Sequence, residues 1–448
     1  MQKTWREKLM LACAALLVLA CGTVFVRVIT DQLLVKKLHM DNVVVQYIFS
    51  DSEQIRANQR SRDVHIAWVK KYPFAVADNE EDRTHRDAPF QRADKKIKSL
   101  EKRIDSWTNK YFLQYITWVR LANAYQDKIN WNVSVIGGYN SVVTLPDGHM
   151  VEFQKRQDVT PLVQVVRDLS NTCHEQGVNF VFVLAPSKIS PTDTAYAGYM
   201  DFTNENSDAF LAGLHETGVD CLDLRTVLPT EGEAKRAMFF KTDHHWLPST
   251  ARMATGYICQ YLHDQFGYEV NLELLEPNQY SERVFPLSWL GSRGRKKTLP
   301  REQADSFTLY YPKFMTSLHV SIPNLRLSTE GDFSCLYDMS VFEIQDVYVR
   351  NLYGVYAYGD RDLEQIENMQ RHDGKKLLLV HDSFGDAVIP FLSLETQYLD
   401  AIDLRSFSGS LKGYIEQNQP DTVVVLYFVE QFNNKADYSS HKYLFDFR

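Results

Sequence analysis

Runs of apolar residues that alternate with helical patterns most constrain the fold of this 448-residue chain. Apolar runs cover residues 178–184, 376–380 and 422–427, and further strands are expected at 219–224 and 401–404. Helical patterns cover about 160–176, 208–215, 248–265 and 411–417. Strands that are apolar on both faces and separated by helices are typical of a parallel sheet with helices on both faces. We therefore expect an α/β domain.

The pattern changes between residues 286 and 358. Stretches at 318–322 and 346–358 alternate or are rich in aromatic and β-branched residues, which indicates a β-rich insertion. Upstream, an alternating stretch from 133, a Pro-Asp-Gly turn and a returning strand near 150–153 predict a hairpin. We expect the main domain to span 133–432, followed by a C-terminal tail at 433–448.

The N-terminus contains a long apolar stretch. Residues 9–26 carry no charge, three basic residues precede them, and the stretch continues beyond Arg27. This length is just enough to cross a bilayer. We therefore expect a cytoplasmic tail and a transmembrane helix within 1–30, a membrane-proximal helical and loop region at 31–132, and a single-pass protein with its main domain outside the cytoplasm.

Two alternatives remain for this stretch. A cleaved signal peptide is one, although no clear small-residue cleavage site precedes the polar region. A lipoprotein is the other, because residues 18–21, which end at Cys21, loosely resemble a lipobox. The apolar run continues after Cys21, which favours an uncleaved anchor.

Charge and cysteine content narrow the classes of partner and cofactor. The net charge of -8 argues against a large nucleic-acid-binding face, and the many tyrosines would suit stacking on sugars. Four of the six cysteines lie outside the apolar N-terminus and have no metal-type spacing. The sequence allows these four cysteines to be either disulfide-bonded or free. We expect no cofactor.

Ser383 follows the apolar strand 376–380 and precedes a helix predicted from Asp386. Ligands of open α/β sheets meet the chain at the carboxyl ends of strands, and a serine on a strand-to-helix turn exposes its hydroxyl. Gly385 suits such a turn, and amides at the helix start could stabilise an oxyanion. The pattern predicts a nucleophile, with a simple helix cap as the alternative.

An acid and two histidines occur together at 243–245, just before a helix that starts near Pro248. In extended chain Asp243 and His245 would share one side and His244 would point to the other. A carboxylate beside an imidazole fixes its tautomer and stabilises the imidazolium. We therefore predict that His245 is the general base for Ser383 and that Asp243 orients it.

A metal site is the competing interpretation of these residues. Asp243, His244, His245, His381 and Asp382 could ligate one or two divalent ions. Adjacent histidines diverge in extended chain, and no further Asp-x-Asp or His-x-His pattern occurs. The sequence therefore favours a site without metal.

Further candidates for substrate or oxyanion contacts follow other strands or lie in a glycine-flanked loop. Lys188 follows strand 178–184, Arg405 follows strand 401–404, and Gly291 and Arg293 lie in the loop 290–294. Each has a plain alternative: a solvated lysine, an arginine that braces the site, and an ordinary turn.

These residues carry a family resemblance. The words Thr-Asp-His-His-Trp at 242–246 and Asp-Ser-Phe at 382–384, with Pro-Phe-Leu at 390–392, resemble the DHHW protein family. That family is similar to the SGNH-hydrolase-like O-acetyltransferases of alginate and exopolysaccharide. The resemblance covers roughly 133–432. Two positions depart from the pattern, His381 in place of a glycine and Phe384 in place of a tyrosine.

The resemblance implies a permuted SGNH-like domain in which Ser383, His245 and Asp243 are nucleophile, base and acid. The implied activity is acetylation of a cell-surface or secreted polysaccharide through an acetyl-serine. A multispanning membrane O-acyltransferase would supply the acetyl donor. A carbohydrate esterase with the same residues, and a catalytically silent scaffold or glycan-binding subunit, are the alternatives.

Overall fold

The computed structural model describes residues 142–145, 147–190, 201–230, 232–344, 346–433 and 444–448. The anchor and membrane-proximal region expected at 1–132, and the first strand of the expected hairpin up to 141, lie outside these residues. Among the residues described, no helix is both long and apolar enough to span a bilayer.

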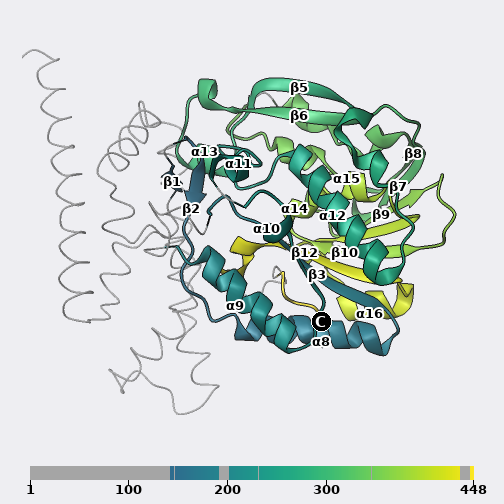
Figure 1. The fold of residues 1–448 in the computed structure, drawn as a ribbon. Helices are drawn as coiled ribbons and strands as arrows, with labels where there is room; N and C mark the ends of the chain where they lie inside the picture. Colours follow the sequence, from purple (N-terminus) through teal and green to yellow (C-terminus); the bar gives the residue numbers. More distant parts are fainter. Residues whose placement is uncertain (1–141, 146, 191–200, 231, 345, 434–443) are drawn as a thin grey trace, which may run out of the picture. The chain divides into compact units, whose positions relative to one another are not determined.

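An eight-stranded sheet forms the centre of the domain (Figure 1). Its strands, in spatial order, are β4 (Cys221–Asp223), β3 (Asn179–Ala185), β12 (Thr422–Phe428), β10 (Lys376–His381), β11 (Tyr398–Ile402), β9 (Glu364–Asn368), β7 (Leu318–Ile322) and β8 (Leu327–Gly331). The first five are parallel, whereas β9, β7 and β8 pair antiparallel. The expected α/β sheet is present, but it is mixed rather than wholly parallel.

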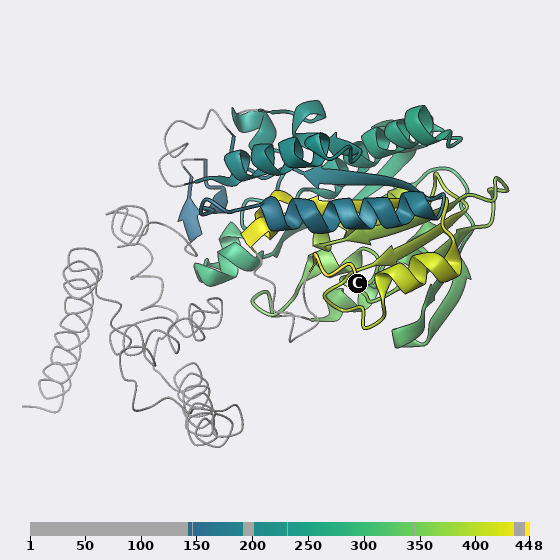
Figure 2. The same ribbon diagram turned by 90° about the horizontal axis from the view of Figure 1, so that it is seen from below.

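Helices cover both faces of the parallel part, as predicted. In Figures 1 and 2, α8 (Thr160–Glu175), α9 (Thr203–Glu216) and α16 (Leu411–Asn418) lie on one face, and α12 (Pro248–Phe266) lies on the other with α15 (Ile389–Leu392). A proline in the first turn and a left-handed glycine at the end delimit α12. Because both faces are covered, all seven residues of β12 are buried.

The β-rich insertion is real, but it is built differently from the expectation. The hairpin of β5 (Tyr280–Trp289) and β6 (Asp305–Pro312) stands apart from the main sheet, whereas β7 and β8 extend that sheet. Residues 346–358 form turns and the 3-10 helix η9 (Leu352–Val355), not a strand. Tyr353 and Tyr356 are buried in the main core and Tyr358 packs against it, so the aromatic content reflects burial rather than strand alternation.

Two further parts of the chain close the domain. The hairpin of β1 (Val142–Thr144) and β2 (Met150–Glu152) forms around the predicted turn. Leu444, Phe445 and Phe447 are buried in the main core, and the carbonyl of Arg448 accepts a hydrogen bond from the Leu411 amide at 2.8 Å. The expected tail at 433–448 therefore includes core residues. Cys173, Cys221, Cys259 and Cys335 are free thiols.

Candidate active site

Ser383 is the first residue of the short helix α14 (Ser383–Asp386), which begins directly after β10. Asp382 is the cap of this helix: its carboxylate accepts from the Phe384 amide at 2.9 Å and from the Phe428 amide, at the end of β12, at 2.8 Å. The alternative that Ser383 itself caps the helix is therefore wrong. The Asp382 carboxylate fixes the turn, and the serine hydroxyl is left for other contacts.

Gly385 serves close packing in this turn. A Cβ atom at this position would lie 2.5 Å from Cβ and Cγ of His381, so the glycine accommodates the histidine that departs from the family pattern. The Gly385 amide donates to the Asp382 carbonyl at 2.8 Å. This amide is occupied in the turn, which does not support the prediction that it binds an oxyanion.

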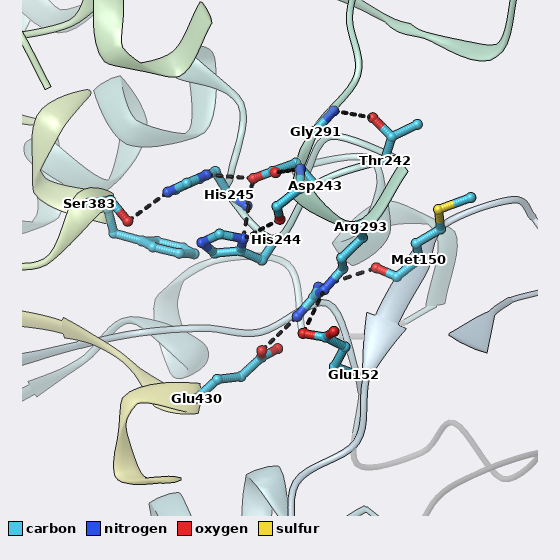
Figure 3. A network of polar contacts seen from close by, with 12 residues as sticks. Met150, Glu152, Thr242, Asp243, His244, His245, Gly291, Arg293, Ser383 and Glu430 are labelled. Atoms are coloured by element: carbon cyan, nitrogen blue, oxygen red, sulfur yellow. Dashed lines mark hydrogen bonds and ion pairs between the residues drawn. The ribbon is translucent and has the colours of Figure 1, made fainter. Parts of the chain in front are cut away.

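The structure brings the three predicted catalytic residues together (Figure 3). Nε2 of His245 lies 2.7 Å from Oγ of Ser383, and Nδ1 of His245 lies 2.5 Å from Oδ1 of Asp243. All three residues are buried. Because Nδ1 faces a carboxylate, it carries the proton, and Nε2 is left to accept one from the serine hydroxyl.

Asp243 is fixed from two directions. The Ser292 amide donates to Oδ2 of Asp243, and a Cβ atom on Gly291 would lie 2.2 Å from Cβ of Asp243. On β6, the carboxylate of Asp305 accepts from the amides of Lys241 and Thr242 at 2.9 and 2.8 Å. The loop and the insertion therefore set the position of the Asp243 carboxylate, and no side chain fits in place of Gly291.

The Asp243 carboxyl remains ionised. Burial acts to raise its pKa, but electrostatic interaction with the His244 and His245 rings and the hydrogen bonds from His245 outweigh burial. Its pKa therefore lies well below the usual value for an aspartate, as expected for a carboxylate that has to stabilise an imidazolium.

His244 does not point away from Asp243, contrary to the sequence prediction. Its Nδ1 lies 3.4 Å from Oδ1 of Asp243 and 3.3 Å from Oγ of Ser292, and its ring centre is 3.9 Å from that of His245. Residues 241–245 form a bend rather than extended chain, so side chains two apart need not share a side. Burial, and electrostatic interaction with the neighbouring His245 ring, hold the pKa of His244 well below its ordinary value.

The metal interpretation can be examined on the same atoms. Asp243, His244 and His245 each offer a ligand atom, and these atoms lie within 4.8 Å of one another. Both ring nitrogens of His245 are in hydrogen bonds, one to Asp243 and one to Ser383. A cation held here would have to replace one of these bonds, so the observed contacts fit a proton-transfer chain better than a metal centre.

Arg293 and Lys188 are buried near Asp243, and both side chains make internal polar contacts. Arg293 donates to Glu430 at 2.6 Å and to the Met150 carbonyl at 3.2 Å (Figure 3). Lys188 donates to the carbonyls of Met150 and Lys241, both at 3.2 Å. Burial, helped by the charge of Arg293, lowers the pKa of Lys188 to about 7. Lys188 holds the segment that carries Asp243 through the Lys241 carbonyl, whereas Arg293 ties its own loop to β2 and to Glu430. Neither side chain has the solvated position that was the plain alternative for Lys188.

Arg405 is a brace as well, as its alternative interpretation stated. It forms a bidentate contact with Asp403, from Nε to Oδ1 and from Nη2 to Oδ2, and it donates to Asp360 at 2.6 Å. Burial raises the pKa of the Asp382 carboxyl, and the hydrogen bond from the Phe428 amide and the positive charge of Arg405 act in the opposite direction. Arg405 thus supports the turn that carries Ser383 from the end of β11.

Sequence reasoning missed three contributors. Ser292 and Asp305 hold Asp243 and its neighbours through backbone amides, and Tyr353 stacks on His245 with ring centres 3.9 Å apart and planes inclined by 15°. Backbone hydrogen bonds leave no sequence signature. Tyr353 is one of several tyrosines in the insertion, and no spacing distinguishes it.

Comparison with known proteins agrees with this arrangement. Residues 147–292 match the family described as SGNH hydrolase-like domain, acetyltransferase AlgX. That stretch includes Asp243, His245 and Gly291 and ends before Ser383. The Alginate biosynthesis protein AlgX of Pseudomonas aeruginosa is 28% identical over 134 residues, which are 28% of this chain. The match spans only 27% of that relative's length.

Solved structures resemble a larger part of the chain. Bacillus cereus PatB1 superposes with a TM-score of 0.55 at 22% identity, covering 69% of this chain and 100% of PatB1, and it has also been solved with a sulfonyl adduct. A DHHW family protein from Eubacterium siraeum superposes with a TM-score of 0.50 at 19% identity, covering 67% of this chain and 94% of that protein. The fold is therefore SGNH-like, and the resemblance to the DHHW family and to AlgX-type acetyltransferase domains that the sequence predicted is confirmed.

Proposed function

We propose that this protein is a membrane-anchored serine acyltransferase that O-acetylates a cell-surface or secreted polysaccharide outside the cytoplasm. The observation that carries the proposal is the continuous chain of hydrogen bonds from Ser383 through His245 to Asp243. The match to an acetyltransferase domain named for AlgX, an alginate biosynthesis protein in Pseudomonas aeruginosa, supports an acetyl group and a polysaccharide as the reactants.

The first half-reaction forms an acetyl-serine. Oγ of Ser383 attacks the carbonyl carbon of an acetyl donor while Nε2 of His245 takes the hydroxyl proton. The tetrahedral intermediate then expels the donor's leaving group, which receives that proton from His245. Asp243 stabilises the imidazolium while it carries the charge.

The second half-reaction transfers the acetyl group. His245 takes the proton of an acceptor hydroxyl, whose oxygen attacks the acetyl carbonyl carbon. Ser383 leaves and regains its proton from His245. A multispanning membrane O-acyltransferase as donor partner, and the anchor in residues 1–30, belong to this proposal through the family resemblance and the apolar N-terminal stretch.

Ser383→Ala in the full-length protein tests the nucleophile. With a chromogenic acetyl ester, we expect wild type to release product with a burst and the variant to lose at least about 10³-fold in rate, because the covalent step is removed. Mass spectrometry of the quenched wild type should find one acetyl group on the peptide that contains Ser383. Ser281→Ala, an exposed serine on β5, is the matched control and should behave as wild type.

Other outcomes of this experiment would change the assignment. Equal rates in wild type and Ser383→Ala, or loss of activity on addition of a chelator, would contradict the serine mechanism. If an added polysaccharide acceptor collects no acetyl groups while acetate is released, the protein is an esterase. If neither turnover nor an acetyl-enzyme is seen, a silent scaffold or glycan-binding subunit becomes the better explanation.

A further inference from the structure

We infer that Tyr353, supplied by the insertion, is a positioning residue that holds the imidazole of His245 in the plane from which Nε2 reaches Ser383. The inference rests on the proposed function, because it gives Tyr353 a role only if His245 serves Ser383. Tyr353 lies outside the sequence motifs of the site and outside the matched stretch 147–292.

The His245 ring is held from two sides. The Tyr353 ring lies 3.9 Å from it and nearly parallel, and the His244 ring lies 3.9 Å from it at a tilt of 34°. Among the ring contacts of the described residues, Tyr353 and His244 each pair with His245 but not with each other. They therefore contact different sides of the imidazole, whose rotation about its side-chain bonds is blocked.

The contact is also suited to a ring that becomes charged. A cation over the face of an aromatic ring is attracted by its quadrupole, so a Tyr353 ring in this position favours the imidazolium formed during proton transfer. The Tyr353 hydroxyl is buried and makes no hydrogen bond of normal geometry among the described residues. The ring, and not the hydroxyl, is thus the part of Tyr353 that acts on His245.

Tyr353 is itself rigidly placed. It is buried, its ring stacks on Trp289 of β5 at 6.1 Å, and it meets the edge of Phe240 at 6.3 Å. Soon after it, Ala357 and Tyr358 adopt positive φ angles of 48° and 55°. Such conformations are costly for residues with a Cβ, and they persist only where the surroundings impose them. The strained turn lies between η9, which carries Tyr353, and β9.

The test compares Tyr353→Leu, Tyr353→Phe and Tyr356→Leu in the full-length protein. Tyr356 is the control for lost packing, because it is equally buried in the same segment and meets the Tyr353 ring at 6.2 Å but makes no ring contact with His245. The readout is the rate at which phenylmethanesulfonyl fluoride modifies Ser383, followed by mass spectrometry. In this reaction Oγ of Ser383 bonds to sulfur, fluoride leaves, and the hydroxyl proton passes to His245, so no acetyl substrate is needed.

We expect Tyr353→Leu to slow labelling by about tenfold to a hundredfold, since a small misplacement of a catalytic group costs this much. Tyr353→Phe keeps the ring and should label close to the wild-type rate. Tyr356→Leu should lower the melting temperature as much as Tyr353→Leu but leave the labelling rate unchanged. If Tyr353→Leu does not fold, Tyr353→Met, whose longer and more flexible side chain adapts to an irregular space without a ring, takes its place with the same expected slowing.

The outcomes separate this inference from the proposed function. If wild type is labelled at Ser383 and Tyr353→Leu is labelled equally fast, or Tyr356→Leu is slowed equally, the positioning role is wrong and the serine mechanism stands. If wild-type Ser383 is not labelled at all, the proposed function is wrong, and the role of Tyr353 falls with it.

Discussion

The parallel and antiparallel parts of the main sheet differ in how they are buried. β10 and β12 are apolar on both faces, because helices cover both. In β7 buried residues alternate with half-buried ones, and in β8 half-buried residues alternate with exposed ones. The parallel part ends in the turn that carries Ser383, whereas the insertion that supplies β7 and β8 also supplies Asp305 and Tyr353. The parallel part thus carries the proposed nucleophile, and the insertion supplies residues that contact His245 and the chain before Asp243.

The difference between the parallel and antiparallel parts can be tested on two buried carboxyl groups, Asp243 beside the parallel part and Glu364 in the antiparallel part. Asp243 is ionised and hydrogen-bonded, whereas both carboxyl oxygens of Glu364, on β9, lack a hydrogen-bond partner among the described residues. Asp243→Asn should lower the rate of acetyl-ester turnover by on the order of 10³- to 10⁴-fold, because an amide neither orients nor stabilises the imidazolium. Steady-state kinetics with Glu364→Gln as the isosteric control checks this. A mild effect of Asp243→Asn would remove Asp243 from the proposed mechanism.

Alanine substitutions at two glycines should have effects on turnover and stability smaller than that of Asp243→Asn. Gly291→Ala would force its Cβ into Asp243, and we expect about a tenfold to hundredfold loss of rate with a lower melting temperature. Gly331→Ala, at the end of β8, would place its Cβ 3.2 Å from Cβ of Cys335, which costs about 1 kcal/mol of stability without slowing turnover. Turnover rate and thermal unfolding of both variants check this prediction. If Gly331→Ala slowed turnover as much as Gly291→Ala does, the difference between the two parts of the molecule would be contradicted.

The smallest effect concerns the pH dependence of stability at Glu364. Burial raises the pKa of this carboxyl well above its ordinary value. The folded protein therefore holds the proton more tightly than the unfolded chain, so the stabilisation is complete below the ordinary glutamate pKa and is lost as pH rises toward the folded pKa. Glu364→Gln removes this dependence.

Melting temperatures of wild type and Glu364→Gln at pH 5 and pH 8 test the sign. The stability of the variant relative to wild type should increase by a few degrees between the two conditions, with turnover unchanged. A difference that stays constant with pH would mean that Glu364 is ionised in the folded protein.

The parallel part could be predicted from the sequence to a large extent. Continuous apolar runs predicted its strands. The Asp-His-His-Trp motif, together with a serine at the end of a strand, predicted that Asp243, His245 and Ser383 form one site. The prediction for His244 failed because a bend replaced the extended chain that was assumed. The cap at Asp382 was missed because a serine and an aspartate are both good caps, and only the hydrogen bonds decide between them.

The insertion was less predictable for physical reasons. Alternating and aromatic residues at 318–322 correctly indicated a strand, but the same signal at 346–358 came from tyrosines packed in a core. Antiparallel addition of β9, β7 and β8 to a parallel sheet has no local signature. The roles of Asp305 and Tyr353 depend on contacts with residues far away in the sequence.

The Asp305 carboxylate has a consequence for redesign of this protein. It joins the β5–β6 hairpin to the two residues before Asp243, so the hairpin cannot be removed without loss of contacts next to the site. A shortened or chimeric protein that exchanged the hairpin would need to keep an acid at this position. Without it, two backbone amides next to the acid–base pair would lose their acceptor, and the pair would lose its alignment even with every catalytic side chain in place.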